Sequence, residues 1–401
     1  MTSLKGIESA APVASWHQRA GVWLGIGINP GSITIGGTLG AQIPLRYLLF
    51  LIPVGALALF LLTVTQGLIS RHRREPLAKR ASTTFGLGAG YRLLNLLMAF
   101  GMIGWGSFYV GLAGFSLADM LSLPGWLGAL LIAGSIYILS ELGLNRWNSL
   151  VWLTTLAALG VAIVALVAVG AQPTLTETSD GFGVSEALWV IGSVVAYAIM
   201  FTLRCSDFTW DLASDWDVIK VGLSLFIPLI ISMLIGAILF QAVGDWNLAD
   251  ILARTDLALL GQLFLLASIA SPTLSGLHSG SLAIGSLTPL GRKQSAAIIC
   301  MVSFILGATR FDYQLRPFLD LMGSILLPAL ALTLVTVRLK QKPTSITAFV
   351  AWLSGAGVAL VFRLQGQLVY IIAGAAVSLA VLFAIMYVTK ANKLSDGTVG
   401  G

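Results

Sequence analysis

Residues 21–40 combine residue types that interrupt a helix with types that bind a polar solute. The stretch GVWLGIGINPGSITIGGTLG holds seven glycines together with Asn29 and Pro30. Proline removes a backbone donor and frees a carbonyl one turn back, and Gly31 tolerates unwound dihedral angles. Carbonyls freed near Ile28 and Gly31 are oxygen ligands for a hard cation such as Na⁺. The following helix would offer its N-terminal amides to a polar solute. This pattern predicts an interrupted helix, and the alternative is a helix that is only kinked and packs tightly.

A second polar stretch, TLRCSDFTWDLA at 202–213, puts Arg204, Asp207 and Asp211 at the end of an apolar run. Two interpretations are open. The charges belong to a second interrupted helix, since a pair of interruptions in corresponding halves of a chain indicates a solute site near the bilayer midplane. Alternatively, Arg204 and Asp207 cap a continuous helix and extend to the cytoplasmic interface.

Hydroxyl side chains are dense in SIASPTLSGLHSGSLAIGS, residues 268–286. Ser271, Thr273 and Ser275 could complete an oxygen shell opposite the first interrupted helix, although hydroxyls also bond to their own helix backbone. His278 is the one histidine expected within the membrane. It is either a proton-exchanging group near physiological pH or a structural donor.

A tryptophan between two glycines, Trp105 with Gly104 and Gly106, lies in the middle of GMIGWGSFYVGLAG. Its ring face would be accessible to a flat ligand, and planar heteroaromatic rings stack well on indole. The alternative is an anchor at the membrane interface, where tryptophan is enriched.

The elements that must position these residues are membrane helices. The chain of 401 residues is 57% hydrophobic and 10% charged, against about 25% charged residues in soluble domains, so a soluble class is excluded. Two cysteines alone make no metal site. Apolar runs of about 20 residues, enough to cross a bilayer, recur about twelve times, near 20–39, 46–69, 92–118, 125–141, 148–170, 186–206, 219–243, 256–276, 281–307, 317–337, 345–361 and 367–389.

Basic residues are distributed unequally between the two sides of these expected helices. Seventeen lie in the loops assigned to the inside and five in the loops assigned to the outside. The positive-inside rule then places both termini in the cytoplasm. The net charge of +6 therefore reflects orientation, and we expect no nucleic-acid partner. The expected location is a multi-pass protein of the plasma membrane, the inner membrane in bacteria.

The two polar stretches fall in the first and sixth expected helices, five helices apart. A repeat of five helices begins on one side of the membrane and ends on the other, so the next copy runs inverted. The sequence thus predicts one polytopic membrane domain over 1–401. It would contain a first inverted repeat at 1–170, a second at 186–337 and two additional helices at 345–389.

At these residues the chain resembles the nucleobase–cation symporter (purine-cytosine permease) family, in particular cytosine permease-like proteins. The matching segments are SITIGGTLG at 32–40, Ile103-Gly104-Trp105, Ser206-Asp207-Phe208, SGSLAIGSLTPLGRK at 279–293 and PFLDLMGSILLPALAL at 317–332. The resemblance implies an all-α fold of about twelve transmembrane helices, with a LeuT-like 5+5 inverted repeat plus two C-terminal helices. It also implies Na⁺- or H⁺-coupled uptake of a nucleobase or related heterocycle, stacked on Trp105.

The chain departs from the family pattern at several of these positions. The aromatic residue implied nine positions before Asp207 is Ala198, with Tyr197 adjacent. Met102 replaces the polar residue three positions before the tryptophan, Ala270-Ser271 replaces consecutive hydroxyls, and the substrate-binding asparagine is missing. These departures predict a site less polar than a cytosine site.

We therefore expect a secondary active transporter, a cation symporter that imports a nucleobase such as cytosine or a purine. Alternatives are transport of a related heterocycle such as hydroxymethylpyrimidine, or a non-transporting membrane sensor of the same fold. We expect no enzyme activity, because His278 and Ser279 are neighbours that point apart on one helix. A channel is disfavoured because no filter motif is visible.

The expected partners are a small heterocyclic substrate and the lipid bilayer, with the chain a monomer and no cofactor beyond the coupling ion, Na⁺ or H⁺. Whether Arg204, Asp207 and His278 take part in coupling is left open. The expected substrate-binding residues are Trp105, Asn29, Ser32, Tyr197, Ala198, Phe201, Ser275 and His278. The expected cation-binding residues are Ile28, Gly31, Ser271 and Thr273.

Overall fold

The computed structural model describes residues 14–141, 144–170, 182–245, 250–251 and 258–395. The described part is helical apart from turns and one isolated bridge between Ala14 and Leu212. This confirms the predicted all-α class. Residues 171–181, 246–249 and 252–257 lie outside the described residues, as does the polar N-terminal segment 1–13.

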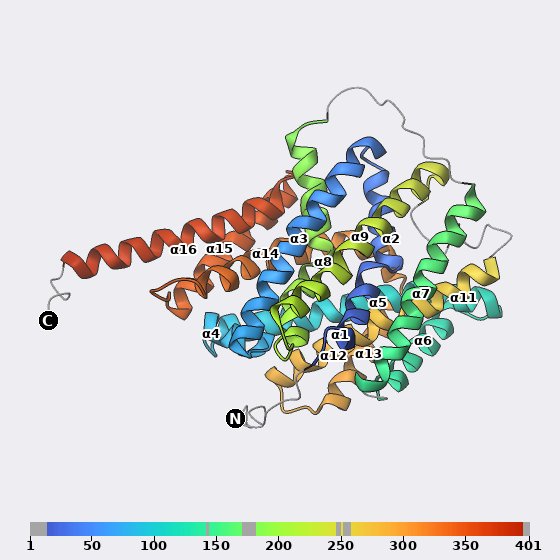
Figure 1. Cartoon of the computed structure of the whole chain (residues 1–401), viewed down its shortest axis with the longest axis horizontal. Helices are drawn as coiled ribbons and strands as arrows, with labels where there is room; N and C mark the ends of the chain where they lie inside the picture. Colours follow the sequence, from blue (N-terminus) through green and yellow to red (C-terminus); the bar gives the residue numbers. More distant parts are fainter. Residues whose placement is uncertain (1–13, 142–143, 171–181, 246–249, 252–257, 396–401) are drawn as a thin grey trace.

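The helices run through the sequence in the order expected from the apolar runs (Figure 1). Each predicted window overlaps one helix or a pair of consecutive helices. Their bounds are α1 His17–Gly27, α2 Pro30–Gly40, α3 Leu45–Arg73, α4 Leu77–Phe85, α5 Ala89–Leu121, α6 Gly125–Ser140, α7 Leu144–Val169, α8 Val184–Thr209, α9 Asp215–Val243, α11 Ala258–Ser268, α12 Ala270–Leu287, α13 Arg292–Ala308, the 3-10 turn η2 Phe311–Gln314, α14 Leu315–Thr336, α15 Ser345–Leu364 and α16 Tyr370–Ser395.

Among the described residues, eight helical segments are long and apolar enough to cross a membrane, and α6 and part of α7 form shorter apolar helices. These segments support a multi-pass membrane protein. The count of twelve spans, the bounds of the two repeats and the cytoplasmic position of the termini stay predictions.

The first expected helix is interrupted where the glycine-rich pattern predicted it. Helix α1 ends at Gly27 and α2 begins at Pro30. Asn29 lies between them in an extended conformation and caps α2. Proline suits this position because the first turn of a helix needs no donor from its amide nitrogen.

The predicted second interruption is wrong. Helix α8 is continuous from Val184 to Thr209, and Arg204 lies within it. The capping alternative is also wrong for Arg204, because this side chain is fully buried in protein rather than extended to an interface. Asp207 is half-buried and accepts a hydrogen bond from the Leu77 amide at 2.9 Å. Asp211 follows α8 and pairs with Arg19 of α1 at 2.6 Å.

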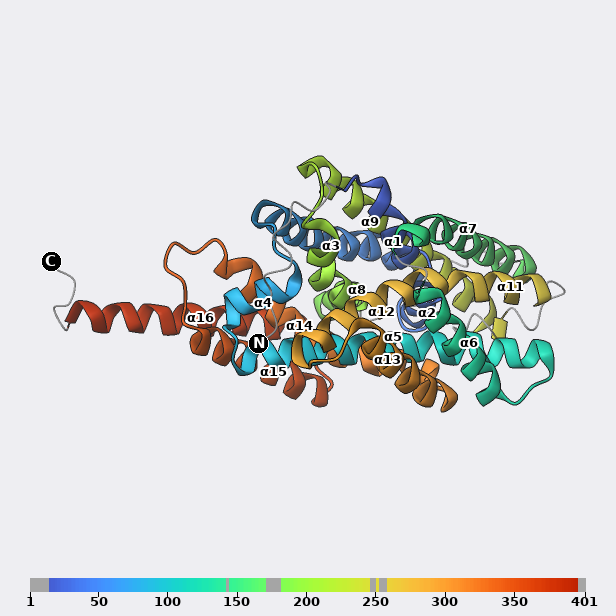
Figure 2. The ribbon, with the colours of Figure 1, turned by 90° about the horizontal axis from the view of Figure 1, so that it is seen from below.

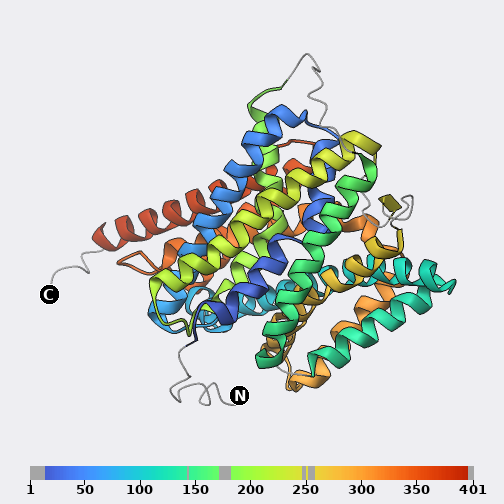
Figure 3. The same ribbon diagram turned by 45° about the vertical axis from the view of Figure 1, so that its right-hand side comes forward.

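The broken helix lies inside a bundle, where α2 packs on α9 and α1 packs on α7, α9 and α12 (Figure 3). Helices α5 and α12 lie side by side, as do α3 and α8. Glycines allow close approach at the α2–α9 crossing. A Cβ atom at Gly36 would collide with the Met233 carbonyl, and one at Gly236 would collide with the Ile33 carbonyl. Small residues at such crossings let helix backbones approach within membranes.

The last two helices, α15 and α16, lie at the edge of this bundle. Helices α15 and α16 pack on each other and on α14, at one end of the molecule. The C-terminal part of α16 projects beyond the other helices (Figures 1 and 2). The short helix α4 instead packs at the bundle through Arg80, which is 2% exposed and donates to the carbonyls of Gln66 and Thr333. Burial lowers the pKa of Arg80 to about 10, so its guanidinium stays charged at neutral pH.

Candidate functional site

The Asn29 side chain joins the broken helix to two other helices. Its Oδ1 accepts from the amides of Gly31 at 2.7 Å and Ser32 at 3.3 Å, and from the Tyr109 hydroxyl of α5 at 2.9 Å. Its Nδ2 lies 2.8 Å from the Tyr197 hydroxyl of α8 and 2.7 Å from the Ile26 carbonyl. The backbone groups exposed by the break are thus satisfied by side chains, as buried backbone polar groups must be.

Tyrosine and serine hydroxyls complete this network. The Tyr197 hydroxyl donates to the Ile26 carbonyl at 2.9 Å. Ser32 donates to the Asn29 carbonyl at 2.8 Å and its Oγ also forms a hydrogen bond with Ser232 Oγ of α9. The break is therefore held from α5, α8 and α9 at once, and a movement of any of these helices alters the conformation at Asn29.

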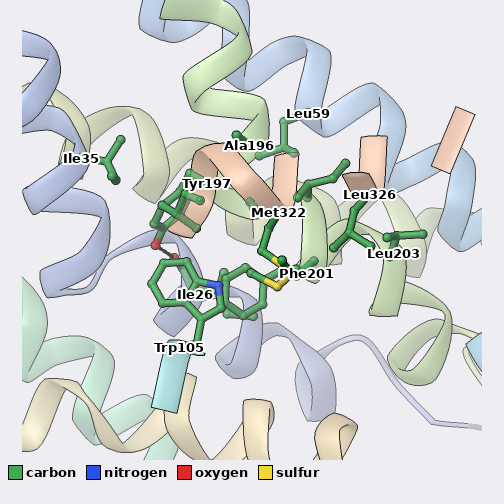
Figure 4. Packing of buried hydrophobic residues seen from close by; sticks show 14 of the residues in the cluster. Ile26, Ile35, Leu59, Trp105, Ala196, Tyr197, Phe201, Leu203, Met322 and Leu326 are labelled. Atoms are coloured by element: carbon green, nitrogen blue, oxygen red, sulfur yellow. Dashed lines mark hydrogen bonds between the residues drawn. The ribbon is translucent and has the colours of Figure 1, made fainter. Parts of the chain in front are cut away.

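An aromatic cluster centred on Trp105 lies directly against the break. A Cβ atom at Gly31 would come within 2.9 Å of the Trp105 ring. Tyr109 stacks on Trp105 with centroids 5.6 Å apart, and Tyr197 meets it edge-on at 5.4 Å. Phe201 lies tilted at 5.3 Å. Figure 4 shows Trp105 beside Tyr197 and Phe201, which project from α8.

This arrangement encloses the Trp105 ring in the described conformation. Trp105 and Phe201 are each 1% exposed and Tyr197 is fully buried. Trp105 is therefore not an interface anchor. A planar ligand would have to displace one of the neighbouring rings, so binding requires the helices around the cluster to move apart.

Arg204 follows Phe201 by three residues on the same face of α8, and its guanidinium contacts α12 and α5. Its Nη1 donates to the Ser275 carbonyl at 2.6 Å and its Nη2 to Ser275 Oγ at 2.9 Å. Nη1 also lies 3.3 Å from Met102 Sδ. The guanidinium carbon lies 4.5 Å from the centroid of the Phe201 ring. Ser275 is therefore connected to the aromatic cluster only indirectly, through its hydrogen bonds with Arg204.

Two other expected substrate residues are placed less directly. Ala198 is fully buried next to Tyr197, and Tyr197, not Ala198, provides the aromatic ring. His278 lies beside Phe208, with ring centroids 5.9 Å apart, and Phe208 lies seven residues beyond Phe201 on α8. His278 is therefore grouped with Phe208 rather than with Trp105.

The four expected cation ligands do not form one cluster. Gly31 packs against Trp105, and Ile28 caps α1 through its amide. Thr273 donates to the Ile269 carbonyl of its own helix at 2.6 Å and lines a small cavity of about 20 Å³ between α5, α6, α12 and α13. Of the two expected ligands from α12, Ser271 and not Thr273 contacts the broken helix.

Ser271 Oγ is buried without a hydrogen-bond partner and lies against Gly25 of α1. A Cβ atom at Gly25 would collide with this hydroxyl, and it would lie 3.7 Å from Thr155 Oγ1 of α7. Three helices thus bring oxygen atoms together near Gly25. No group of three or more His, Cys, Asp or Glu residues that could hold a metal ion occurs in the described part of the chain.

Sequence reasoning missed Tyr109, Ser232 and Thr155. Tyr109 lies four residues after Trp105, the spacing that puts two side chains on one helix face, so a signal for it existed. Ser232 and Thr155 had none, because only the packing of α9 and α7 on the broken helix brings them to it.

Comparison with solved structures places this arrangement in a known fold. The chain resembles Mhp1, a nucleobase-cation-symport-1 family transporter, in a closed conformation with bromovinylhydantoin bound (TM-score 0.72, 14% identity, 96% of each chain covered). It resembles inward-facing Mhp1 equally well (TM-score 0.72, 16% identity, 98% of this chain and 95% of Mhp1). The fold is thus the LeuT-like fold that the sequence predicted.

Two further structures share this fold. A Na⁺-coupled sialic acid symporter matches with a TM-score of 0.65 and 14% identity, over 92% of this chain and 89% of its own. A manganese transporter of Eremococcus coleocola matches with a TM-score of 0.64 and 15% identity, over 96% of this chain and 98% of its own. All these proteins are transporters. No protein-family model and no curated protein matches the sequence.

Proposed function

We propose that this protein belongs to the nucleobase–cation symporter family and is a secondary active transporter that imports a planar heterocycle, such as a nucleobase or hydroxymethylpyrimidine. The observation that carries this proposal is the contact between the broken first helix and Trp105. An interrupted membrane helix puts backbone groups beside a cavity or ligand, and here Gly31 packs directly on the indole ring.

The residues around the break fit a flat ligand with polar edges. Trp105 and Phe201 offer ring faces, and planar rings gain attraction by offset stacking. The Asn29 amide and the Tyr197 and Tyr109 hydroxyls offer donors and acceptors that can exchange their present partners for ligand atoms. Ser32 would act indirectly, because its hydroxyl donates to the Asn29 carbonyl and helps to position Asn29. The residues proposed to contact substrate are therefore Trp105, Phe201, Tyr197, Tyr109 and Asn29.

The coupling cation would bind at Ser271. Hard cations take oxygen ligands, and Ser271 Oγ is a buried oxygen without a partner. Thr155 Oγ1 of α7 and backbone carbonyls of α1 lie near the same point beside Gly25. This site lies on the α1 side of the break, so ion binding and ligand binding act on the two halves of one helix.

Transport would then follow from opening of the closed arrangement. Alternating access in this class of proteins occurs by rocking of one helix bundle against another around a fixed site. The three helices that hold the break, α5, α8 and α9, are the elements whose relative movement would release Trp105.

Uptake into proteoliposomes tests this function. Radiolabelled cytosine, uracil, purines and hydroxymethylpyrimidine are offered with and without an inward Na⁺ gradient or pH gradient. We expect gradient-driven accumulation of one of them, with at least tenfold less in Trp105→Ala. Ser271→Ala should lower the dependence on Na⁺, whereas Ser281→Ala, a buried serine of the same helix that bonds to its own backbone, should not.

The outcomes separate the alternatives. Ligand binding without accumulation would identify a sensor of the same fold. Accumulation that Trp105→Ala leaves intact would show that the substrate binds elsewhere. Uptake that depends on a pH gradient and not on Na⁺ would assign H⁺ as the coupling ion and remove the role of Ser271.

A further inference from the structure

Arg204 is a charged side chain enclosed within the membrane-spanning helices. It is fully buried, and it belongs to a segment long and apolar enough to span. Ionisable side chains inside membrane segments are costly and mark functional sites by default. Arginine does not lose its proton in proteins, so the positive charge is permanent.

The charge of Arg204 lacks a carboxylate partner among the residues that the structure describes. Asp207 is on the next turn of α8 and instead accepts from the Leu77 amide. The neutral Ser275 provides the oxygen acceptors for Arg204, through its carbonyl and its hydroxyl. Nε of Arg204 is buried with no hydrogen-bond partner. Buried charges are normally paired. Asp207 acts on Arg204 through its charge but forms no hydrogen bond or ion pair with it, so the Nε donor and a direct carboxylate contact are left for a group that the protein itself does not supply.

Arg204 is continuous with the site around Trp105. Tyr197, Phe201 and Arg204 occupy positions i, i+4 and i+7 of α8, which lie on one face of a helix. On α5, Met102 contacts the guanidinium and lies three residues before Trp105. The guanidinium packs on one neighbour of Trp105, the Phe201 ring. A ligand ring beside Trp105 and Phe201 would thus place a substituent at Arg204.

We propose that the substrate is an anion, a planar heterocycle with a carboxylate substituent that binds Arg204 while its ring stacks at Trp105. This inference rests on the proposed function and names its substrate class. A carboxylate accepts two parallel hydrogen bonds from a guanidinium, which here would use Nε and one Nη. The neutral acceptors of Ser275 would hold the guanidinium in place when no substrate is bound.

Matched pairs of probes that differ by one charge test the proposal. Orotate is uracil with a carboxylate on the ring, and nicotinate and nicotinamide form a second pair. The full-length purified protein is heated with each probe, because a ligand that binds the folded state raises its apparent melting temperature. We expect orotate to raise the melting temperature as much as uracil does at a concentration at least tenfold lower. Nicotinate and nicotinamide should differ in the same way.

Two variants of Arg204 then assign the preference to this residue. Arg204→Met removes the charge and retains the length of the side chain. Arg204 forms no ion pair with a described carboxylate, so the replacement does not break a buried pair, and Ser275 Oγ still donates to the Pro272 carbonyl. We therefore expect Arg204→Met to keep the melting temperature and lose the preference for the anion. Arg204→Lys should keep a weakened preference, since lysine has the charge without the paired donors.

Arg80→Met is the matched control. Arg80 is also a buried arginine that donates to carbonyls of other helices, but it lies on α4, outside the aromatic cluster. The Arg80→Met variant should keep the preference for orotate over uracil, even if the substitution changes the melting temperature of the protein without ligand.

Each result decides the proposal. An anion preference that persists in Arg204→Met would show that Arg204 is only structural. Stronger binding of uracil than of orotate, abolished by Trp105→Ala, would overturn the anionic substrate and leave the proposed heterocycle transport intact. If neither member of either pair binds, the anionic class is wrong, and uptake of the neutral bases then decides whether the proposed function also fails.

Discussion

At the scale of single residues, the side chain that makes the broken helix possible is Asn29. An extended residue inside a membrane segment exposes amides and carbonyls that lipid cannot satisfy. The carboxamide has both donors and an acceptor, and it uses them on Gly31, Ser32, Ile26, Tyr109 and Tyr197. Ionised aspartate has acceptors only and serine has a single hydroxyl, so neither could form this set of hydrogen bonds.

Asn29→Ala should therefore destabilise the protein strongly. The substitution leaves several buried donors and acceptors without partners, each worth about 1–3 kcal/mol. We expect the free energy of unfolding to fall by about 3 kcal/mol. The measurement is thermal unfolding of the purified variant in detergent.

Asn95→Ala is the matched control for this measurement. Asn95 is also buried on a membrane helix, but its amide donates only to the Tyr91 carbonyl of its own helix. Its loss should cost about 1 kcal/mol. Equal effects of the two substitutions would show that Asn29 is not the junction of the break.

At the scale of elements, the position of the broken helix depends on how closely α2 approaches α9. Gly36 and Gly236 bring the two backbones into contact, and Ser32 and Ser232 meet one turn away. Close approach increases dispersion contacts, which drive helix association in membranes. The break is thus fixed from outside as well as by its own cap.

Gly236→Ala should disrupt this crossing. The added methyl would overlap the Ile33 carbonyl, and overpacking of this kind costs about 1–3 kcal/mol. We expect a lower melting temperature together with a loss of uptake, because α2 must shift and Ser32 shifts with it.

Gly357→Ala provides the comparison on another helix. No atom lies within 4 Å of a Cβ placed at Gly357 of α15, and alanine is favoured over glycine in a helix by up to about 1 kcal/mol. This variant should match or exceed the stability of the native protein. A Gly236→Ala variant that behaved the same way would contradict the close crossing.

At the scale of the whole molecule, the described arrangement is a closed one. Asn29 and Ser32 are fully buried and Trp105 is 1% exposed, so no solute reaches the cluster without a movement of helices. The closed and inward-facing structures of Mhp1 match this chain with the same TM-score. Global similarity therefore does not distinguish the states, and the burial of the site does.

Cysteine labelling should detect the opening. In a background in which Cys205 and Cys300 are replaced by serine, Ser32→Cys introduces a single thiol. At the break it changes only one buried atom, the side-chain oxygen to sulfur. If the bundle rocks, a small hydrophilic thiol reagent should modify this cysteine slowly in membranes, and a bound substrate that holds the site closed should slow it further. Labelling is followed by mass spectrometry over time.

Thr288→Cys is the reference for a freely accessible position, because Thr288 is exposed at the end of α12. Its labelling should be fast and insensitive to substrate. If Ser32→Cys reacted as fast as Thr288→Cys, the closed arrangement would not be the resting one. If it never reacted during active uptake, the rocking mechanism would be excluded.

The sequence by itself determined the helical class, the positions of the apolar segments and the interruption at Asn29 and Pro30. These follow from local physics: hydropathy selects the spans, and proline and glycine interrupt a helix whatever surrounds it. The motifs around Trp105 also led to the correct fold. Even the pairing of Trp105 with Tyr109 was accessible, because helical spacing alone puts residues four apart on one face.

Only the tertiary structure decided what surrounds those residues. It showed that α8 is unbroken and that Arg204 is enclosed, because neighbouring helices, not the polarity of 202–213, determine whether a charge meets lipid, water or protein. It separated Thr273 from Ser271 and brought Thr155 and Ser232 to the broken helix. Contacts between helices depend on crossing angles and register, and these are set by the packing of the whole bundle.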